Sequence, residues 1–371
     1  MRVLHLTRDF PPPARGGIST AVAGQVAACR GRGIGALVLS FERGRGDVSP
    51  LVDEEIGGVP VVRVRTADHL DAALAAAATR GFDVVHVHEP LWWPVLAAHA
   101  PGAPLVISVH VDHEHMAALR GGDGGRSLEA QRGLLAAADV VVAPSRAAAD
   151  RLRAGMPARA ARLEVVPHGI VVPEAPPAGP REPLVACVGR FDERKGTADF
   201  VGAAQMLLGD RPGVRAVIAG GLPANPGAER RWRRRWLAAW PPEVAARIEL
   251  PGWLDSGALA ALYRRAAVVA VPSHYETFGL VALEAMAHGA PLVATRAGGL
   301  VDLVDDGTTG LLCRPGAVAA LAAAIGRLLD GPELAARLGA AAAVRARRDF
   351  APAALAGRWE DVYGRALARR R

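Results

Sequence analysis

Short apolar segments alternate with longer helical patterns along the whole of this chain. The apolar segments are continuous runs, as expected for strands that are covered on both faces. Strands of this kind, separated by helices, form βαβ units and a parallel sheet, so we predict an α/β fold. The predicted strands are Val3–Thr7, Ala36–Ser40, Val61–Val64, Val84–His88, Leu105–Val109, Val140–Ala143, Leu163–Val166, Leu184–Val188, Val214–Ala219, Arg247–Leu250, Val268–Val271, Leu292–Ala294 and Leu311–Cys313.

A proline-rich segment interrupts this pattern near the middle of the chain. Residues 173–183 contain five prolines, which stiffen the backbone and prevent regular structure, so we interpret them as a linker. A length of 371 residues suits two domains. We predict an N-terminal domain over 1–172 and a C-terminal domain over 184–351, facing each other across a cleft. Ligands are expected beyond the carboxyl ends of the strands.

Composition and charge limit the class of protein. The chain has 51% hydrophobic and 22% charged residues, which is typical of a soluble globular protein. Its net charge of +7 fits an anionic substrate, a membrane surface or a nucleic acid, but the charge is not gathered into one tail, which disfavours nucleic acid. The three widely spaced cysteines predict no disulfide framework, and no apolar run has the length of a signal peptide or membrane span. We therefore expect a cytoplasmic protein.

Two glutamates, separated by seven residues, flank the start of a predicted helix. Glu276 follows the strand Val268–Val271, and Glu284 lies inside the helix. The helix opens with Phe278-Gly279-Leu280, whose backbone N–H groups have no partner within the helix and can bind an anion. Carboxylates accept hydrogen bonds from sugar hydroxyls. An anion site beside two such acceptors indicates a sugar-nucleotide site.

Two cations follow the first strand of the C-terminal half. Arg190 and Lys195 stand five residues apart, ahead of a predicted helix. The planar guanidinium and the compact ammonium could together clamp a diphosphate. The alternative is a solvated turn in which these charges pair with Asp192 and Glu193.

The N-terminal half offers two further candidates. Gly16-Gly17 lies between the first strand and the helix Ile18–Arg30, where glycines let backbone approach a ligand closely, although a flexible turn also explains them. His110 ends a strand, where it could donate to a sugar hydroxyl. Neighbouring histidines could suggest a metal site, but their spacing is not that of a ligand set, so we predict no metal.

Three tryptophans recur every fourth residue in an arginine-rich segment. Trp232, Trp236 and Trp240 would share one face of a helix, with arginines on the others. This pattern is typical of a membrane-surface or RNA-binding helix. The alternative is that the tryptophans pack on the second domain while the arginines face solvent.

Taken in order, these segments resemble glycosyltransferase family 4, a group of retaining, nucleotide-sugar-dependent enzymes with the GT-B fold. The resemblance covers nearly the whole chain. Its motifs are the Gly16-Gly17 loop, Asp83–His88, the His110 strand, Val166–Ile170, Gly189-Arg190 with Lys195-Gly196, and Glu276 with Glu284–Pro291.

The resemblance implies a role for each residue of the donor site. Arg190 and Lys195 would bind the donor diphosphate, and Glu284 the ribose hydroxyls. Glu276 would hold hydroxyls of the transferred sugar, with the amides of Phe278, Gly279 and Leu280 near the phosphates and the sugar.

The resemblance also implies a Rossmann-like fold for both domains, with acceptor binding in the first. Gly16 and Gly17 would lie against the diphosphate, and His110 would contact the sugar near the reacting carbon. Together with Arg190, Lys195 and Glu276, His110 is expected to be catalytic. The final helix, within 352–371, would pack back on the first domain. The chain departs from the family at His168, usually asparagine, and at Asp302, usually glutamate.

We therefore expect a glycosyltransferase of the hexosyltransferase type. It would move a sugar from a UDP or GDP donor to a hydroxyl of a glycan, a glycolipid or a small metabolite, without a metal or cofactor. A sugar-nucleotide epimerase or a phosphorylase of the same fold is one alternative. A basic membrane- or RNA-binding protein built on Trp232–Trp240 is another, and an enzyme with peripheral membrane contact through residues 229–240 would combine the two. The sequence does not identify the acceptor.

Overall fold

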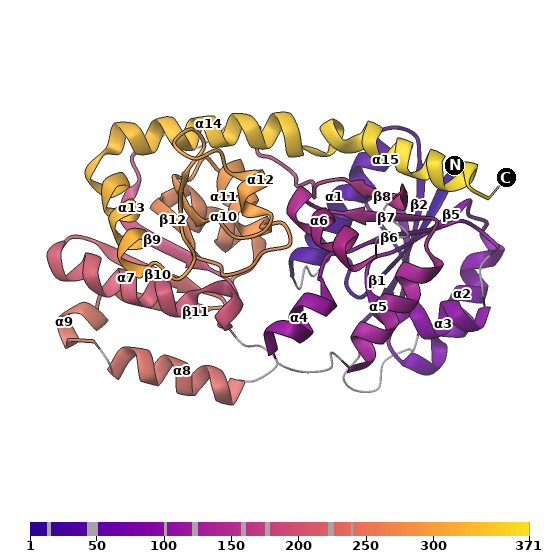
Figure 1. Cartoon of the computed structure of the whole chain (residues 1–371), viewed down its shortest axis with the longest axis horizontal. Helices are drawn as coiled ribbons and strands as arrows, with labels where there is room; N and C mark the ends of the chain where they lie inside the picture. The colour runs from indigo at the N-terminus through magenta and orange to yellow at the C-terminus, as the bar shows by residue number, and fades with distance from the viewer. Residues whose placement is uncertain are drawn as a thin grey trace. The chain divides into compact units, whose positions relative to one another are not determined.

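The computed structural model describes residues 1–12, 16–42, 51–99, 102–120, 125–156, 161–174, 179–221, 226–238 and 240–370. The chain forms two compact units (Figure 1). Unit 1 contains Met1–Val171 and Phe350–Arg371, and unit 2 contains Val172–Asp349. Part of the predicted linker, residues 175–178, lies outside the described residues, and its last two residues, Glu182 and Pro183, already belong to a strand.

The described part of unit 1 is built on one eight-stranded sheet in the order β3-β4-β2-β1-β5-β6-β7-β8. Its strands are β1 (Arg2–Thr7), β2 (Gly35–Phe41), β3 (Leu51–Ile56), β4 (Val59–Val64), β5 (Val84–Val87), β6 (Leu105–Ser108), β7 (Val140–Ala143) and β8 (Leu163–Val165). Its helices are α1 (Gly17–Arg30), α2 (Leu70–Thr79), α3 (Trp93–His99), α4 (His113–Arg120), α5 (Gly125–Ala137), α6 (Arg146–Gly155) and α15 (Pro352–Ala368).

Strand β3, which was not predicted, adds one antiparallel pair to the otherwise parallel sheet. It pairs antiparallel with β4 through a turn at Gly57 and Gly58, both of which have positive φ. A two-residue turn with this backbone suits glycine and fixes the hairpin. The strand was not predicted because its sequence, Leu-Val-Asp-Glu-Glu-Ile, is polar and its side chains are half-buried or exposed, as suits the edge of a sheet.

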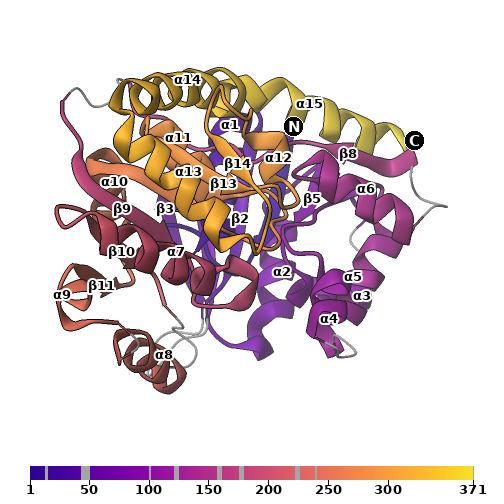
Figure 2. The same ribbon diagram turned by 60° about the vertical axis from the view of Figure 1, so that its left-hand side comes forward.

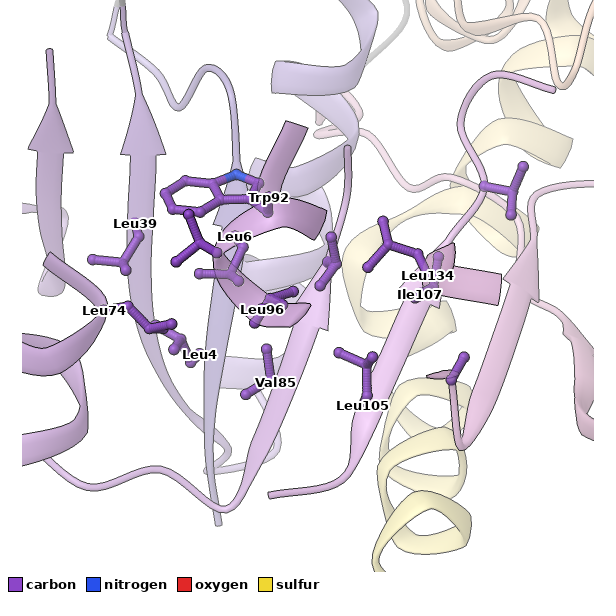
Figure 3. Close-up of a cluster of buried hydrophobic side chains, with 14 of the residues drawn as sticks. Leu4, Leu6, Leu39, Leu74, Val85, Trp92, Leu96, Leu105, Ile107 and Leu134 are labelled. Atoms are coloured by element: carbon purple, nitrogen blue, oxygen red, sulfur yellow. The ribbon is translucent and has the colours of Figure 1, made fainter. Parts of the chain in front are cut away.

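The two faces of this sheet are buried by different helices. On one face Leu4, Leu6 and Val85 pack with Trp92 and other apolar side chains (Figure 3). On the other face Val3, Val84 and Val106 pack with α15. Because successive strand residues point to opposite faces, His5 and His86 lie on the same face as Val3 and Val84. The yellow C-terminal helix α15 in Figure 1 is therefore part of the core of unit 1.

The described part of unit 2 contains a six-stranded parallel sheet in the order β11-β10-β9-β12-β13-β14. Its strands are β9 (Glu182–Val188), β10 (Arg215–Ala219), β11 (Ile248–Gly252), β12 (Ala266–Val271), β13 (Leu292–Thr295) and β14 (Leu311–Cys313). Its helices are α7 (Thr197–Asp210), α8 (Pro226–Ala238), α9 (Pro242–Ala245), α10 (Ser256–Arg265), α11 (Leu280–Ala287), α12 (Leu300–Leu303), α13 (Val318–Asp330) and α14 (Pro332–Phe350).

Buried aliphatic residues of β9, β10 and β12 pack against α7 and α13, which lie side by side in Figure 2. The strands are short and buried, so their carboxyl ends place the following loops along one edge of the sheet. In the described part of the chain, no helix is long and apolar enough to cross a membrane.

Candidate active site

The loops that follow β9 and β12 lie against each other because these strands are neighbours in the sheet. The backbone N–H of His274 donates to the carbonyl oxygen of Arg194 at 2.8 Å. Gly196 sits at this contact with φ of 63°, and a Cβ there would lie 2.0 Å from the carbonyl oxygen of Pro272. Only glycine fits this position, so the turn that carries Lys195 is fixed against the loop that carries Glu276.

Glu276 is buried, and hydrogen-bond donors surround its carboxylate. Its side chain accepts hydrogen bonds from Lys195 Nζ at 2.5 Å and Ser273 Oγ at 2.9 Å, and Arg194 Nη1 lies 3.8 Å away. Burial by itself would raise the pKa of Glu276, but the charges of Lys195 and Arg194 and these hydrogen bonds outweigh it and lower the pKa. Glu276 is therefore a carboxylate.

Glu284 lies within helix α11, which follows the loop that carries Glu276, and its pKa is shifted in the opposite direction. Tyr263 donates its hydroxyl hydrogen to Glu284 Oε2 at 3.0 Å. Burial raises the pKa of Glu284 to about 7, although the Tyr263 hydrogen bond and the charge of Lys195 oppose the rise. The two glutamates thus differ in charge near neutral pH, and Lys195 acts on both.

Lys195 is the only lysine in a sequence with 44 basic residues. Its side chain is 17% exposed, whereas that of Arg190 is 53% exposed and lies 3.5 Å from Asp192. The alternative of a charged turn therefore describes Arg190 in this structure but not Lys195. Arg194, which sequence reasoning did not single out, is the second cation at Glu276; it stands in the same charged run as the two predicted cations.

The start of α11 directly follows the loop that carries Glu276. The helix begins at Leu280, and Gly279 precedes it with φ of 110° and no side-chain cap, next to the buried Phe278. The loop after β13 packs behind this point, where Gly299 N–H donates to the carbonyl oxygen of Glu276 at 2.8 Å. A Cβ on Gly298 would lie 2.0 Å from that same oxygen. The third loop thus fixes the backbone of Glu276.

In unit 1, Gly16 and Gly17 form the start of α1, and residues 13–15 of the predicted loop lie outside the described residues. A Cβ on Gly16 would meet no atom of the described residues within 4 Å, so none of these residues requires glycine there. A ligand could. Nearby in the sheet, the carboxyl end of β5 carries Glu89, whose pKa burial raises to about 7 and whose Oε2 accepts a hydrogen bond from Arg8 N–H. Glu89 was not predicted, although it follows the His86–His88 segment directly.

His110 lies at the carboxyl end of β6 with both ring nitrogens occupied. Its Nε2 lies 3.0 Å from His88 Nδ1, and its Nδ1 lies 3.4 Å from His168 Nε2. Burial lowers the pKa of His110 to about 4, so the ring is neutral. A sugar hydroxyl can bind a ring nitrogen of His110 only by replacing one of these two partners.

Among the described residues, His5, His86 and His88 are the group that could supply three metal ligands. Except for His5 Nε2, their ring nitrogens are already engaged in hydrogen bonds. His86 contacts Gln25, Tyr363 and Ser108, and His88 contacts His5 and His110 through its two nitrogens. A metal would have to break most of these bonds, so the residues do not fit a resident ion.

The tryptophan pattern is explained by packing in unit 2. Trp232 and Trp236 lie on α8 and pack against the core, with Trp236 5.2 Å from the ring of Phe191. Trp240 is buried and lies beyond the end of α8, so it does not extend the same helical face as predicted. The three tryptophans therefore pack in or against the hydrophobic core of unit 2.

Comparisons with known proteins show the family and the fold of the chain. The chain matches the family "Glycosyl transferases group 1" over residues 172–345 and the "Glycosyl transferase 4-like domain" over residues 16–169. It is 31% identical to the glycogen synthase of Mycobacterium tuberculosis over 399 residues, which covers 98% of this chain and 94% of that protein. It is 37% identical to the D-inositol 3-phosphate glycosyltransferase of Acidothermus cellulolyticus over 327 residues, which covers 81% and 71%. The solved sucrose-phosphate synthase from Thermosynechococcus elongatus has a TM-score of 0.83 at 25% identity, over 99% of this chain and 100% of that one.

Proposed function

Because the chain belongs to the group 1 glycosyltransferases, with the GT-B fold, we propose that it transfers a sugar from a UDP or GDP donor to an acceptor hydroxyl. The transfer retains the anomeric configuration and uses no metal. The observation that supports this most is the pairing of the single lysine with Glu276, beside Glu284 and the open start of α11. These groups offer a cation, two acceptors and backbone donors within one set of loops.

Charge develops on the leaving diphosphate as the sugar departs. Lys195, Arg190 and the first N–H groups of α11 would stabilise that charge, which is preorganised electrostatics rather than proton transfer. Without donor, Lys195 is held by Glu276. A diphosphate would draw the ammonium away and free the Glu276 carboxylate for a sugar hydroxyl. Glu284 would bind the ribose hydroxyls, and His110 a hydroxyl of the transferred sugar.

The departing phosphate oxygen would accept the proton of the acceptor hydroxyl, so no separate base is needed. The names of the relatives differ in what they act on, and therefore favour no acceptor. We keep the acceptor class at a glycan, a glycolipid or a small metabolite.

The test is a transfer assay with UDP-glucose and GDP-mannose as donors and a panel of hydroxyl acceptors, read by the anomeric proton coupling of the product. We expect acceptor-dependent release of nucleoside diphosphate and an α-linked product. Donor consumption without acceptor would favour an epimerase, and dependence on phosphate would favour a phosphorylase. A product with inverted configuration would refute the retaining mechanism.

A second candidate activity, peripheral contact with an anionic membrane, rests on the arginines of α8. Arg230, Arg231, Arg234 and Arg235 are exposed and occupy an arc of about 140° at 100° per residue, opposite the tryptophans. The one acidic residue of the helix, Glu229, is bonded to Arg233 instead. Leu237, 39% exposed, borders this face. A basic face with an aliphatic border suits anionic lipid headgroups.

Co-sedimentation with vesicles tests this contact. We expect binding to phosphatidylglycerol–phosphatidylcholine vesicles that weakens with salt, and its loss when the four α8 arginines are changed to glutamine. The matched control changes four exposed arginines elsewhere, Arg126, Arg327, Arg337 and Arg358, for the same change in net charge. Equal loss in both variants would show that net charge alone acts. Binding to single-stranded RNA but not to vesicles would favour the RNA alternative.

A further inference from the structure

Four histidines of unit 1 form one continuous chain of ring contacts across the carboxyl side of the sheet. His5 Nδ1 lies 3.1 Å from His88 Nε2, and His88 Nδ1 lies 3.0 Å from His110 Nε2. His110 Nδ1 then lies 3.4 Å from His168 Nε2. The residues come from β1 and from the loops after β5, β6 and β8, so the fold, not local sequence, brings them together.

Each ring in this chain is neutral. Burial lowers the pKa of His5 to about 3 and of His110 to about 4, and it lowers the pKa of His88 and His168 well below the ordinary value. A neutral imidazole carries one N–H and one bare nitrogen. Every contact in the chain needs one of each.

This requirement couples the four proton positions. If His5 carries its hydrogen on Nδ1, it donates to His88 Nε2, which forces the hydrogen of His88 onto Nδ1. The same step then repeats at His110 and His168. If His5 carries its hydrogen on Nε2 instead, all four rings must be Nε2-protonated. Only these two arrangements keep every hydrogen bond.

The His5 end of this series of rings favours one of them. His5 Nε2 is fully buried and has no hydrogen-bond partner among the described residues. In the second arrangement this atom would be a buried N–H without an acceptor, which is a rare and costly state. In the first arrangement it carries only a lone pair. The arrangement in which Nδ1 carries the hydrogen is therefore favoured for all four histidines.

We propose that His5 and His88 are positioning residues that fix His110 as a hydrogen-bond donor at Nδ1, directed toward a substrate oxygen. This rests on the proposed function, in which His110 contacts a sugar hydroxyl. The contact from His110 to His168 is the longest of the three, so it is the one that a hydroxyl oxygen would replace. His88 is too deeply placed to touch substrate and acts only through His110.

His86 provides an internal reference, because its ring hydrogen is expected on Nε2 and not on Nδ1. Its Nδ1 lies 2.8 Å from Gln25 Nε2, which can only donate, so its hydrogen belongs on Nε2, where Ser108 Oγ accepts at 2.8 Å. The structure thus assigns two opposite tautomers to rings whose centroids are 4.3 Å apart, those of His86 and His88.

Nitrogen NMR of the full-length, donor-free protein with ¹⁵N-labelled histidine tests the assignment. Nδ1 and Nε2 shifts identify the tautomer of each ring, and single substitutions assign the signals. We expect Nδ1-protonated His5, His88 and His110 and Nε2-protonated His86. An Nε2-protonated or charged His110 would overturn the proposal. This result does not depend on sugar transfer, so a failed transfer assay would refute the proposed function and leave the tautomers tested.

Two variants of His88 separate donation from packing. In His88→Asn the side-chain amide keeps an N–H near the position of Nδ1, whereas His88→Leu removes the donor. We expect His88→Leu to give mixed tautomers at His110 and a drop in kcat of about tenfold at unchanged donor KM, the size of one neutral hydrogen bond. His88→Asn should retain the His110 tautomer and most of kcat. Equal loss in both variants, or none in His88→Leu, would contradict the proposal. His69→Asn, at a half-buried position outside the series of histidine rings, serves as the control.

Discussion

Lys195 Nζ lies 2.5 Å from Glu276 Oε1, which joins the loop after β9 to the loop after β12. The pair keeps a buried carboxylate charged and holds the single lysine of the chain at the carboxyl edge of the sheet. An ion pair of this kind is stable without ligand but can exchange a carboxylate for a diphosphate. This exchange is the central step of the proposed donor binding.

Changing Lys195 should reduce turnover by orders of magnitude without unfolding unit 2. The Lys195→Ala variant removes the compact charge, and Lys195→Arg restores charge in a planar group that does not match a single ammonium site. We expect both to lose most of kcat, with Lys195→Arg partly rescued in diphosphate affinity. Calorimetry and transfer assays measure the two effects, and circular dichroism checks the fold. Near-normal turnover in Lys195→Ala would refute the role.

Nucleoside diphosphate affinity should rise as the pH rises through about 7. Glu284 has a pKa of about 7, above its ordinary 4.5, and its ionised form accepts hydrogen bonds from the two ribose hydroxyls more strongly than its protonated form. Tyr263→Phe removes a hydrogen bond that lowers this pKa, so the rise in affinity should move to higher pH. Calorimetry at several pH values measures the profile. Tyr363→Phe, which removes a buried hydroxyl in unit 1, should leave the profile unchanged; an equal shift there would exclude the explanation.

Unit 1 should lose stability in mild acid. The pKa values of His5 and His110 are lowered from 6.5 to about 3 and about 4, and those of three further buried histidines are lowered as well. The unfolded chain therefore binds more protons than the folded unit below pH 6.5. The stability is complete above about 6.5 and falls toward about 4, by up to about 1.4 kcal/mol per pH unit for each histidine.

Urea unfolding at several pH values, followed by tryptophan fluorescence, measures this loss. His5→Leu should make the dependence on pH shallower by the share of one histidine. A free energy of unfolding that stays constant over this range would show that these histidines are already charged in the folded protein.

Gly196→Ala should destabilise unit 2 and impair donor binding together. The added Cβ would lie 2.0 Å from the carbonyl oxygen of Pro272, at a φ of 63° that alanine adopts poorly. A cost of about 1–3 kcal/mol or more is expected. Gly209→Ala, in the helix α7 that Gly196 precedes, is the matched control, because no described atom lies within 4 Å of its added Cβ. It should be neutral or slightly stabilising. Thermal melts of both variants measure the difference in stability.

Gly16→Ala addresses the first unit. No atom of the residues that the structure describes clashes with the added methyl group, so the fold should be unaffected. If Gly16 lies against the diphosphate, donor KM should rise several-fold while the melting temperature stays the same. An unchanged donor KM would remove Gly16 from the site.

The parallel strands could be predicted because they are short apolar runs, most of them followed by a helix. The start of α11 and both glutamates follow from local spacing in the same way. The edge strand β3 could not be predicted, since its polar sequence carries no apolar pattern. Arg194 was overlooked because a run of charges does not reveal which member turns inward. Its exposed neighbour Arg190 looked equivalent in sequence.

The histidine chain was beyond sequence reasoning for a different reason. His5, His88, His110 and His168 are far apart along the chain, and only the strand order brings their rings together. The sequence predicted a cluster near His110 but not its hydrogen bonds. For the α8 tryptophans the periodicity was visible, while the core they contact was not.

The single lysine allows the central claim to be measured directly. Protein labelled with ¹⁵N-lysine contains one side-chain ammonium, that of Lys195. Titration with UDP and with GDP should shift this resonance in a saturable manner with one of them, as Glu276 is exchanged for phosphate oxygens. An ammonium resonance that stays unchanged while either nucleotide binds would contradict the proposed donor site.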